Sequence, residues 1–198
     1  MRLSRGLEQN TLGAQQHLPR PHGFLMTYTD IHAVSVGQVE LTRDFIHRLP
    51  KTDLHVHLDG SMRLETILEL AEQQNVELPA TTRDELAKAI HMGEICESLT
   101  DYLTAFDVTL SVLQDEASLF RTAYELAEDA AKENVRYMEV RYSPILHTRK
   151  QLTMTRILEA VLNGLEEARR DHGIHTAVII CGIRHIAPQQ SLRLAELA

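Results

Sequence analysis

Cysteine is scarce in this sequence of 198 residues, and so are long apolar runs. The two cysteines, Cys96 and Cys181, lie far apart, so we expect neither a disulfide framework nor a cysteine-based zinc module, and a reducing cytoplasm is the expected location. The longest apolar run, residues 177–183, is far too short to cross a bilayer. The first residues lack a compact apolar segment with a small-residue cleavage site, so a secretory signal is not expected.

Several catalytic signatures are also missing. The sequence has no His-Glu-x-x-His, no Gly-rich phosphate loop, no Gly-x-Ser-x-Gly, and no His-x-Glu combined with Pro-Cys-x-x-Cys. A net charge of −8 argues against a phosphate-backbone partner, so we expect neither nucleic acid nor membrane as a partner. Hydrophobic residues at 43% and charged residues at 24% are ordinary for a soluble globular domain.

Residues 49–60 concentrate the chemistry that is present. Side chains alternate along an extended strand, so His55 and His57 point to the same side, and Asp53 and Asp59 share that side if the strand reaches them. Two imidazoles on one rigid strand make a good first half of a metal site. The alternative is that these polar residues are simply solvated at the end of a strand.

The remaining pattern predicts an α/β protein with about three parallel strands. Residues 52–58 form the first, 135–142 the second, and the almost continuous apolar run 174–183 the third. Helical spacing predicts additional helices between the first and second strands, the first of them capped by Ser61. This order fits successive parallel crossovers.

Charged residues near the strands require partners. Glu139 and Arg141 fall in the middle of the second strand, where we expect partners inside the fold, one possibility being each other. His147 lies in the loop after that strand and is expected to be exposed. His185 follows the third strand, where a barrel places active-site groups.

Two strings resemble motifs of one family. Residues 51–61, KTDLHVHLDGS, are similar to the first-strand signature of the adenosine deaminase family of amidohydrolase-type metal-dependent hydrolases, and residues 137–144, YMEVRYSP, resemble its second-strand motif. The resemblance extends from about Leu41 to the last residue. It implies the N-terminal part of an incomplete TIM (β/α)₈ barrel over residues 39–198, preceded by a flexible N-terminal extension, residues 1–38.

The resemblance also implies a reaction and a site. Water activated by one zinc ion would displace the 6-amino group of adenosine, or of a related amino-purine, as ammonia. His55 and His57 match zinc ligands, and His57 and Asp59 match positions that border the small nucleoside substrate. Leu99, Tyr102 and Phe106 would form an apolar gate over the substrate entrance, although their spacing by itself favours a stripe of core residues.

The family's remaining ligands and its catalytic acid come from later strands, and no catalytic residue is identified in this chain. A typical (β/α)₈ barrel has about 250 residues, and the family's His-Ala-Gly-Glu string is absent. We therefore expect a truncated chain that is inactive alone and that needs the missing C-terminal half of the barrel, in cis or in trans. The alternatives are a non-catalytic fragment or interaction module that reuses part of the barrel, and a metal hydrolase of another substrate class.

Overall fold

A computed structural model describes residues 41–90 and 99–198, with side chains described from residue 106 onward in the second range. The predicted flexible extension, residues 1–38, lies outside the described residues, as does Cys96. The helices and strands follow in this order: α2 Arg43–Arg48, β1 Lys51–His57, α3 Leu64–Gln74, α4 Arg83–Ile90, α5 Leu99–Val112, α6 Glu116–Lys132, β2 Val135–Tyr142, the 3₁₀ helix η1 Pro144–His147, α7 Met154–His172, β3 His175–Ile180 and α8 Pro188–Leu197.

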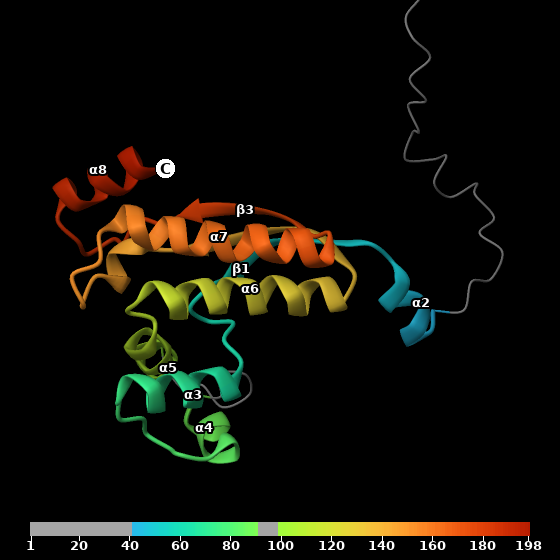
Figure 1. The fold of residues 1–198 in the computed structure, drawn as a ribbon, viewed down its shortest axis with the longest axis horizontal. Helices are drawn as coiled ribbons and strands as arrows, with labels where there is room; N and C mark the ends of the chain where they lie inside the picture. Colours follow the sequence, from blue (N-terminus) through green and yellow to red (C-terminus); the bar gives the residue numbers. More distant parts are fainter. Residues whose placement is uncertain (1–40, 91–98) are drawn as a thin grey trace, which may run out of the picture. The chain divides into compact units, whose positions relative to one another are not determined.

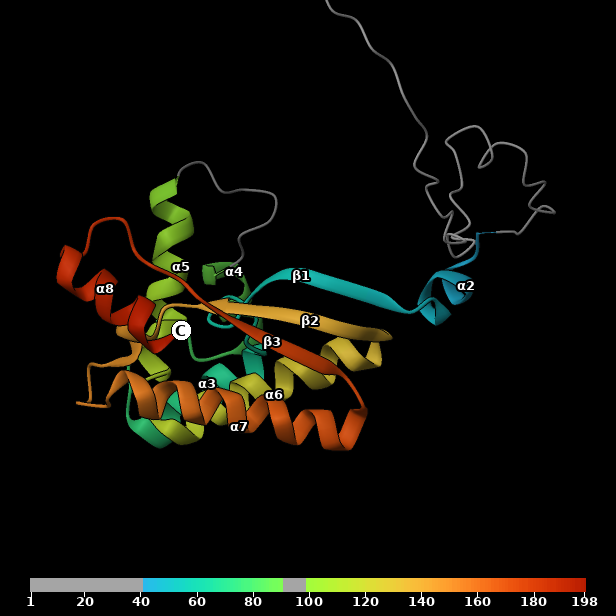
Figure 2. The same ribbon diagram turned by 90° about the horizontal axis from the view of Figure 1, so that it is seen from above.

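The three strands form one parallel sheet in the order β1-β2-β3 (Figure 2). Among the described residues, four helices lie between β1 and β2 along the chain, whereas η1 and α7 connect β2 to β3. The predicted α/β class, the parallel strands and the additional helices after the first strand are therefore confirmed. The strand predicted for residues 135–142 has the bounds that the structure gives to β2.

The main core lies between the sheet and helices α6 and α7 (Figure 1). On β2, Met138, Val140 and Tyr142 are buried against these helices, while the residues between them face the other side of the sheet. Gly164 lets α6 and α7 approach closely, because a Cβ at this position would lie 2.3 Å from the carbonyl oxygen of Phe120. Small and branched side chains thus supply most of the apolar burial that holds the layers together.

Helices α3, α4 and α5 gather around a second, smaller core. Ile67, Leu70 and Ala71 from α3 pack with Leu86 from α4 and Val112 from α5. The spacing of these α3 residues follows the helical period, so one face of the helix is buried. Asn75 ends α3 in the left-handed conformation, as is typical of a helix C-terminus.

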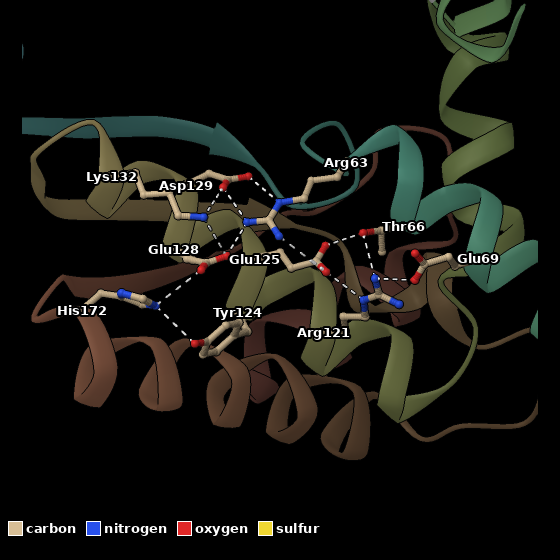
Figure 3. A network of polar contacts seen from close by, with 10 residues as sticks. All are labelled: Arg63, Thr66, Glu69, Arg121, Tyr124, Glu125, Glu128, Asp129, Lys132 and His172. Atoms are coloured by element: carbon tan, nitrogen blue, oxygen red, sulfur yellow. Dashed lines mark hydrogen bonds and ion pairs between the residues drawn. The ribbon is translucent and has the colours of Figure 1, made fainter. Parts of the chain in front are cut away.

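A network of charged side chains joins the start of α3 to α6 (Figure 3). Arg63 immediately precedes α3 and donates to Asp129 and Glu128, with its Nε 2.8 Å from Asp129 Oδ2. Arg121 on α6 pairs in the reverse direction with Glu69 on α3, at 2.8 Å. The network therefore fastens the segment after β1 to the helix layer behind the sheet.

The pairing of β1 with β2 is irregular in the middle of the strand. Asp53 pairs with Met138 and Val56 with Val140, so β1 has one residue more than β2 between these points. Asp53 Oδ1 accepts a hydrogen bond from the backbone of His55 at 3.0 Å. The simple alternation predicted for this strand is therefore interrupted between Asp53 and His57. Among the described residues, no helix combines the length and hydropathy of a membrane-crossing segment.

Candidate active site

The candidate site lies where the three strands end. Hydrogen bonds between the strands continue past their ends, from Leu58 N to Arg141 O at 3.1 Å and from Cys181 N to Tyr142 O at 2.9 Å. A pocket of ≈ 440 Å³ opens there, with α5 as one wall. Its lining residues come from all three strand ends, α5 and η1: His57, Asp59, Phe106, Asp107, Leu110, Tyr142, Ser143, Leu146, Cys181, Ile183 and His185.

The structure brings His55 and His57 together at the end of β1. Their ring centroids are 5.5 Å apart and their planes are inclined by 35°. His55 is exposed, whereas His57 is partly buried and lines the pocket. The two imidazoles therefore place ring nitrogens that could bind a metal side by side.

Arg141 is the partner of His55. Its Nη1 lies 3.0 Å from His55 Nε2, and because a guanidinium can only donate, the imidazole nitrogen accepts. Glu139 instead accepts a hydrogen bond from the Tyr137 hydroxyl at 3.0 Å. The hypothesis that Glu139 and Arg141 pair with each other is therefore wrong, because each is nearer to another polar group on the same side of the sheet.

Asp59 lies in the turn after β1, beyond the last strand residue. It is only 4% exposed, and its Oδ1 has no hydrogen-bond partner among the described residues. Burial raises the pKa of this carboxyl, although backbone N–H groups of the turn and the neighbouring His57 act in the opposite direction. A buried carboxylate oxygen without a partner at the edge of a pocket is suited to accept a hydrogen bond from a bound hydroxyl group.

Ser61 and Gly60 determine how this turn is held. The Ser61 hydroxyl donates to the carbonyl oxygen of His57 at 2.6 Å, so Ser61 is not the N-cap that the sequence predicts, and α3 begins at Leu64 after Arg63. A Cβ at Gly60 would lie 3.4 Å from the ring of Phe106. The turn is therefore closed onto the end of β1 on one side and lies against α5 on the other.

Phe106 is the one residue of the predicted gate whose side chain is described. Its ring lies edge-on to that of His57, with centroids 6.3 Å apart, and it lines the pocket. Leu99 and Tyr102 belong to the same helix, but their side chains lie outside the description. Phe106 thus places an apolar surface directly beside the imidazole and the turn that carries Asp59.

His147 contradicts the sequence prediction, because it is fully buried. Its Nδ1 lies 2.8 Å from the carbonyl oxygen of Leu113, and burial lowers its pKa to about 4. The loop that was expected to expose it forms the 3₁₀ helix η1, which turns the side chain inward. His185 is exposed and lines the pocket.

Several lining residues were not identified as site residues from the sequence. Among them, Tyr142 ends β2, Ser143 follows it, and Leu146 lies in η1. Their position at the carboxyl end of a parallel strand is the signal that could have found them, since such ends form the sites of parallel α/β folds. Burial raises the pKa of the Tyr142 hydroxyl, which has no partner among the described residues.

Both the sequence and the structure of this chain are similar to those of known proteins. The family model described as adenosine deaminase matches residues 50–198. A probable adenosine deaminase of Dictyostelium discoideum is 48% identical over 158 residues, which cover 80% of this chain and 20% of that protein. An adenosine deaminase of Streptococcus mutans is 44% identical over 149 residues, which cover 75% of this chain and 42% of that protein.

Among solved structures, an amidohydrolase from Burkholderia ambifaria with bound Zn superposes with a TM-score of 0.68 at 27% identity, covering 82% of this chain and 44% of that one. The predicted incomplete (β/α)₈ barrel is confirmed by these similarities together with the three parallel strands. The chain spans less than half the length of the curated relatives that it matches.

Proposed function

The chain belongs to the adenosine deaminase family, and from this membership we propose that it forms the N-terminal part of a hydrolase that removes the 6-amino group of adenosine or a related amino-purine. The observation that carries the proposal is the neighbourhood of His55, His57 and Asp59. Two imidazoles with ring centroids 5.5 Å apart lie next to a buried carboxylate at the edge of a pocket.

We infer that His55 and His57 hold one zinc ion. Neutral imidazoles are the commonest protein ligands of this metal, and both side chains come from the same strand. The described residues bring no third His, Cys, Asp or Glu to them, so the remaining ligands belong to another part of the protein. The chemistry that zinc supplies when bound is the activation of water for attack on carbon.

The residues of this chain would position the nucleoside. Asp59 would accept a hydrogen bond from a hydroxyl group of the substrate through Oδ1, which has no partner within residues 41–90 and 99–198. Phe106 would offer an apolar face to the purine, and His57 would border both the metal and the substrate. The guanidinium of Arg141, now 3.0 Å from His55 Nε2, would yield that nitrogen to the metal.

The partner in this proposal is the C-terminal half of the barrel, in cis or in trans. It would complete the zinc ligands and supply the catalytic residues, none of which is identified in this chain. The alternative is a non-catalytic module that reuses part of the barrel. It is favoured by one observation, the absence of a third metal-binding group near His55 and His57 among the described residues.

A chimaera tests the proposal. Residues 50–198 would replace the matching segment of the Streptococcus mutans relative, which is 44% identical, and deamination would be followed by the change in ultraviolet absorbance of adenosine. We expect the chimaera to be active and its His57→Ala variant to lose both zinc and activity. In Asp59→Asn we expect the KM for adenosine to rise roughly ten-fold or more, because a hydrogen bond to a charged group is lost.

The exposed His175, on β3 outside the pocket, provides the matched control. His175→Ala removes an imidazole without touching the proposed site, so zinc content and activity should remain those of the parent chimaera. A folded chimaera that binds zinc equally well with and without His57, or that turns over adenosine without it, would contradict the proposal.

A further inference from the structure

Two buried side chains hold the C-terminal end of α5. The last carbonyl groups of a helix have no partner within the helix and must find one elsewhere. Gln114 Nε2 lies 2.7 Å from the carbonyl oxygen of Leu110, and His147 Nδ1 lies 2.8 Å from that of Leu113. Neither contact comes from α5 itself, and His147 is 34 residues from Leu113 along the chain.

The amide of Gln114 also reaches η1. Its Nε2 lies 3.0 Å from the carbonyl oxygen of Leu146, and its Oε1 accepts a hydrogen bond from the backbone of Arg149 at 2.9 Å. With 2% of its surface exposed, this side chain uses both ends of its amide in the protein interior. One buried amide therefore connects the end of α5 to the segment after β2.

The groups joined in this way belong to the pocket. Leu110 on α5 and Leu146 on η1 both line it, and the Gln114 amide bonds to the backbone of each. The His147 ring lies edge-on to Tyr142, a third lining residue, with ring centroids 5.7 Å apart. These two side chains thus link the α5 wall of the pocket to the end of β2.

We propose that Gln114 and His147 are positioning residues that fix the α5 wall of the pocket, with Phe106 and Leu110, against the end of β2. The inference rests on the proposed function only in treating this pocket as the nucleoside site. Neither side chain lines the pocket. Their effect would pass through the backbone of α5 and η1.

Hydrogen exchange on the 198-residue chain tests this assignment. In His147→Ala, the amides of residues 108–113 should exchange on the order of ten-fold faster, because the loss of one buried hydrogen bond releases the helix end. Gln114→Met should act in the same way, and it remains informative if His147→Ala does not fold. The amides of α6 serve as the internal reference in both variants.

Two further variants separate positioning from general stability. His147→Asn keeps a donor near the position of Nδ1 and should restore slow exchange in α5. Tyr124→Phe removes the 2.9 Å hydrogen bond to Asp171 between α6 and α7 and should leave α5 unchanged.

The inference is overturned if His147→Ala and Gln114→Met leave α5 exchange unchanged, if they accelerate α5 and α6 equally, or if His147→Asn is as fast as His147→Ala. The measurement requires neither zinc nor a nucleoside. It therefore gives its answer whether or not the proposed deaminase activity is found.

Discussion

His147 shows how strongly a single side chain depends on its surroundings. It carries an ordinary titratable group, yet it is fully buried with one hydrogen bond, from Nδ1 to the Leu113 carbonyl, and with Nε2 unpartnered among the described residues. Charging the ring would place a cation in the interior, so burial lowers its pKa from 6.5 to about 4.

This shift predicts an acid sensitivity. Between pH 6.5 and about 4 the unfolded chain binds a proton at His147 that the folded chain does not, so folding stability falls as the pH falls through this window. At about 1.4 kcal/mol per pKa unit, the loss amounts to about 3 kcal/mol. Urea unfolding at pH 7 and pH 4 should show that His147→Asn loses less stability than the parent chain by about this amount.

The informative quantity is the difference between the parent chain and His147→Asn in the stability lost from pH 7 to pH 4, because the other titratable groups contribute equally to both. An equal loss of stability in the parent and in His147→Asn would show that His147 can be protonated in the folded chain without cost.

Arg63 connects two secondary-structure elements, because it joins the segment after β1 to α6. It donates to Asp129 and Glu128, and its hydrogen bonds lower the pKa of both carboxyl groups (Figure 3). Glu125 lies nearby, with 3.8 Å between Arg63 Nη1 and its Oε1. Removing the guanidinium would leave three neighbouring carboxylates without their shared cation.

We therefore expect Arg63→Met to lower the free energy of unfolding by about 2 kcal/mol, because the group is only partly buried and the full cost of breaking a buried pair does not apply. The exposed pair of Arg156 with Glu116 supplies the control, and Arg156→Met should cost less than about 1 kcal/mol. Urea unfolding of the three proteins measures both values. Equal effects of the two substitutions would show that the Arg63 network adds nothing beyond an exposed ion pair.

The contact between α6 and α7 leads to a second prediction at this scale. Alanine favours a helix over glycine by about 1 kcal/mol, but a Cβ at Gly164 would lie 2.3 Å from the Phe120 carbonyl oxygen. Gly164→Ala should therefore destabilise the chain, with a net loss of about 2 kcal/mol from overpacking. Thermal unfolding would measure it beside Asn163→Ala, at an exposed position of the same helix, which should change stability little. A Gly164→Ala variant more stable than the parent would mean that the two helices separate without cost.

At the scale of the whole molecule, the sheet has two unpaired edges. Within residues 41–90 and 99–198, β1 and β3 each pair with β2 alone, and Leu54 on β1 is 56% exposed. Open strand edges with apolar residues promote association between chains. We expect sedimentation velocity to show association that increases with concentration, and Leu54→Lys to reduce it. A single monomeric species from micromolar to near-millimolar concentration would contradict this expectation.

Features that arise from interactions between neighbouring residues could be predicted from the sequence, whereas contacts between distant segments could not. The bounds of β2 could be predicted, because alternation along a strand is a property of neighbouring residues. The partner of Arg141 could not, since His55 is 86 residues away. Ser61 was misassigned because its hydroxyl bonds to the preceding strand rather than to the helix that follows.

The sequence by itself determined the family and the order of strands and helices, because these follow from motifs and from local periodicity, and it supplied His55 and His57 as the proposed zinc ligands. Only the tertiary structure decided that Asp59 is buried, with no partner for Oδ1 in the part of the chain that the structure describes, that His147 faces inward, and that Gln114 connects α5 to η1. These outcomes depend on segments that are distant in sequence coming into contact, and burial exists only once the layers have packed.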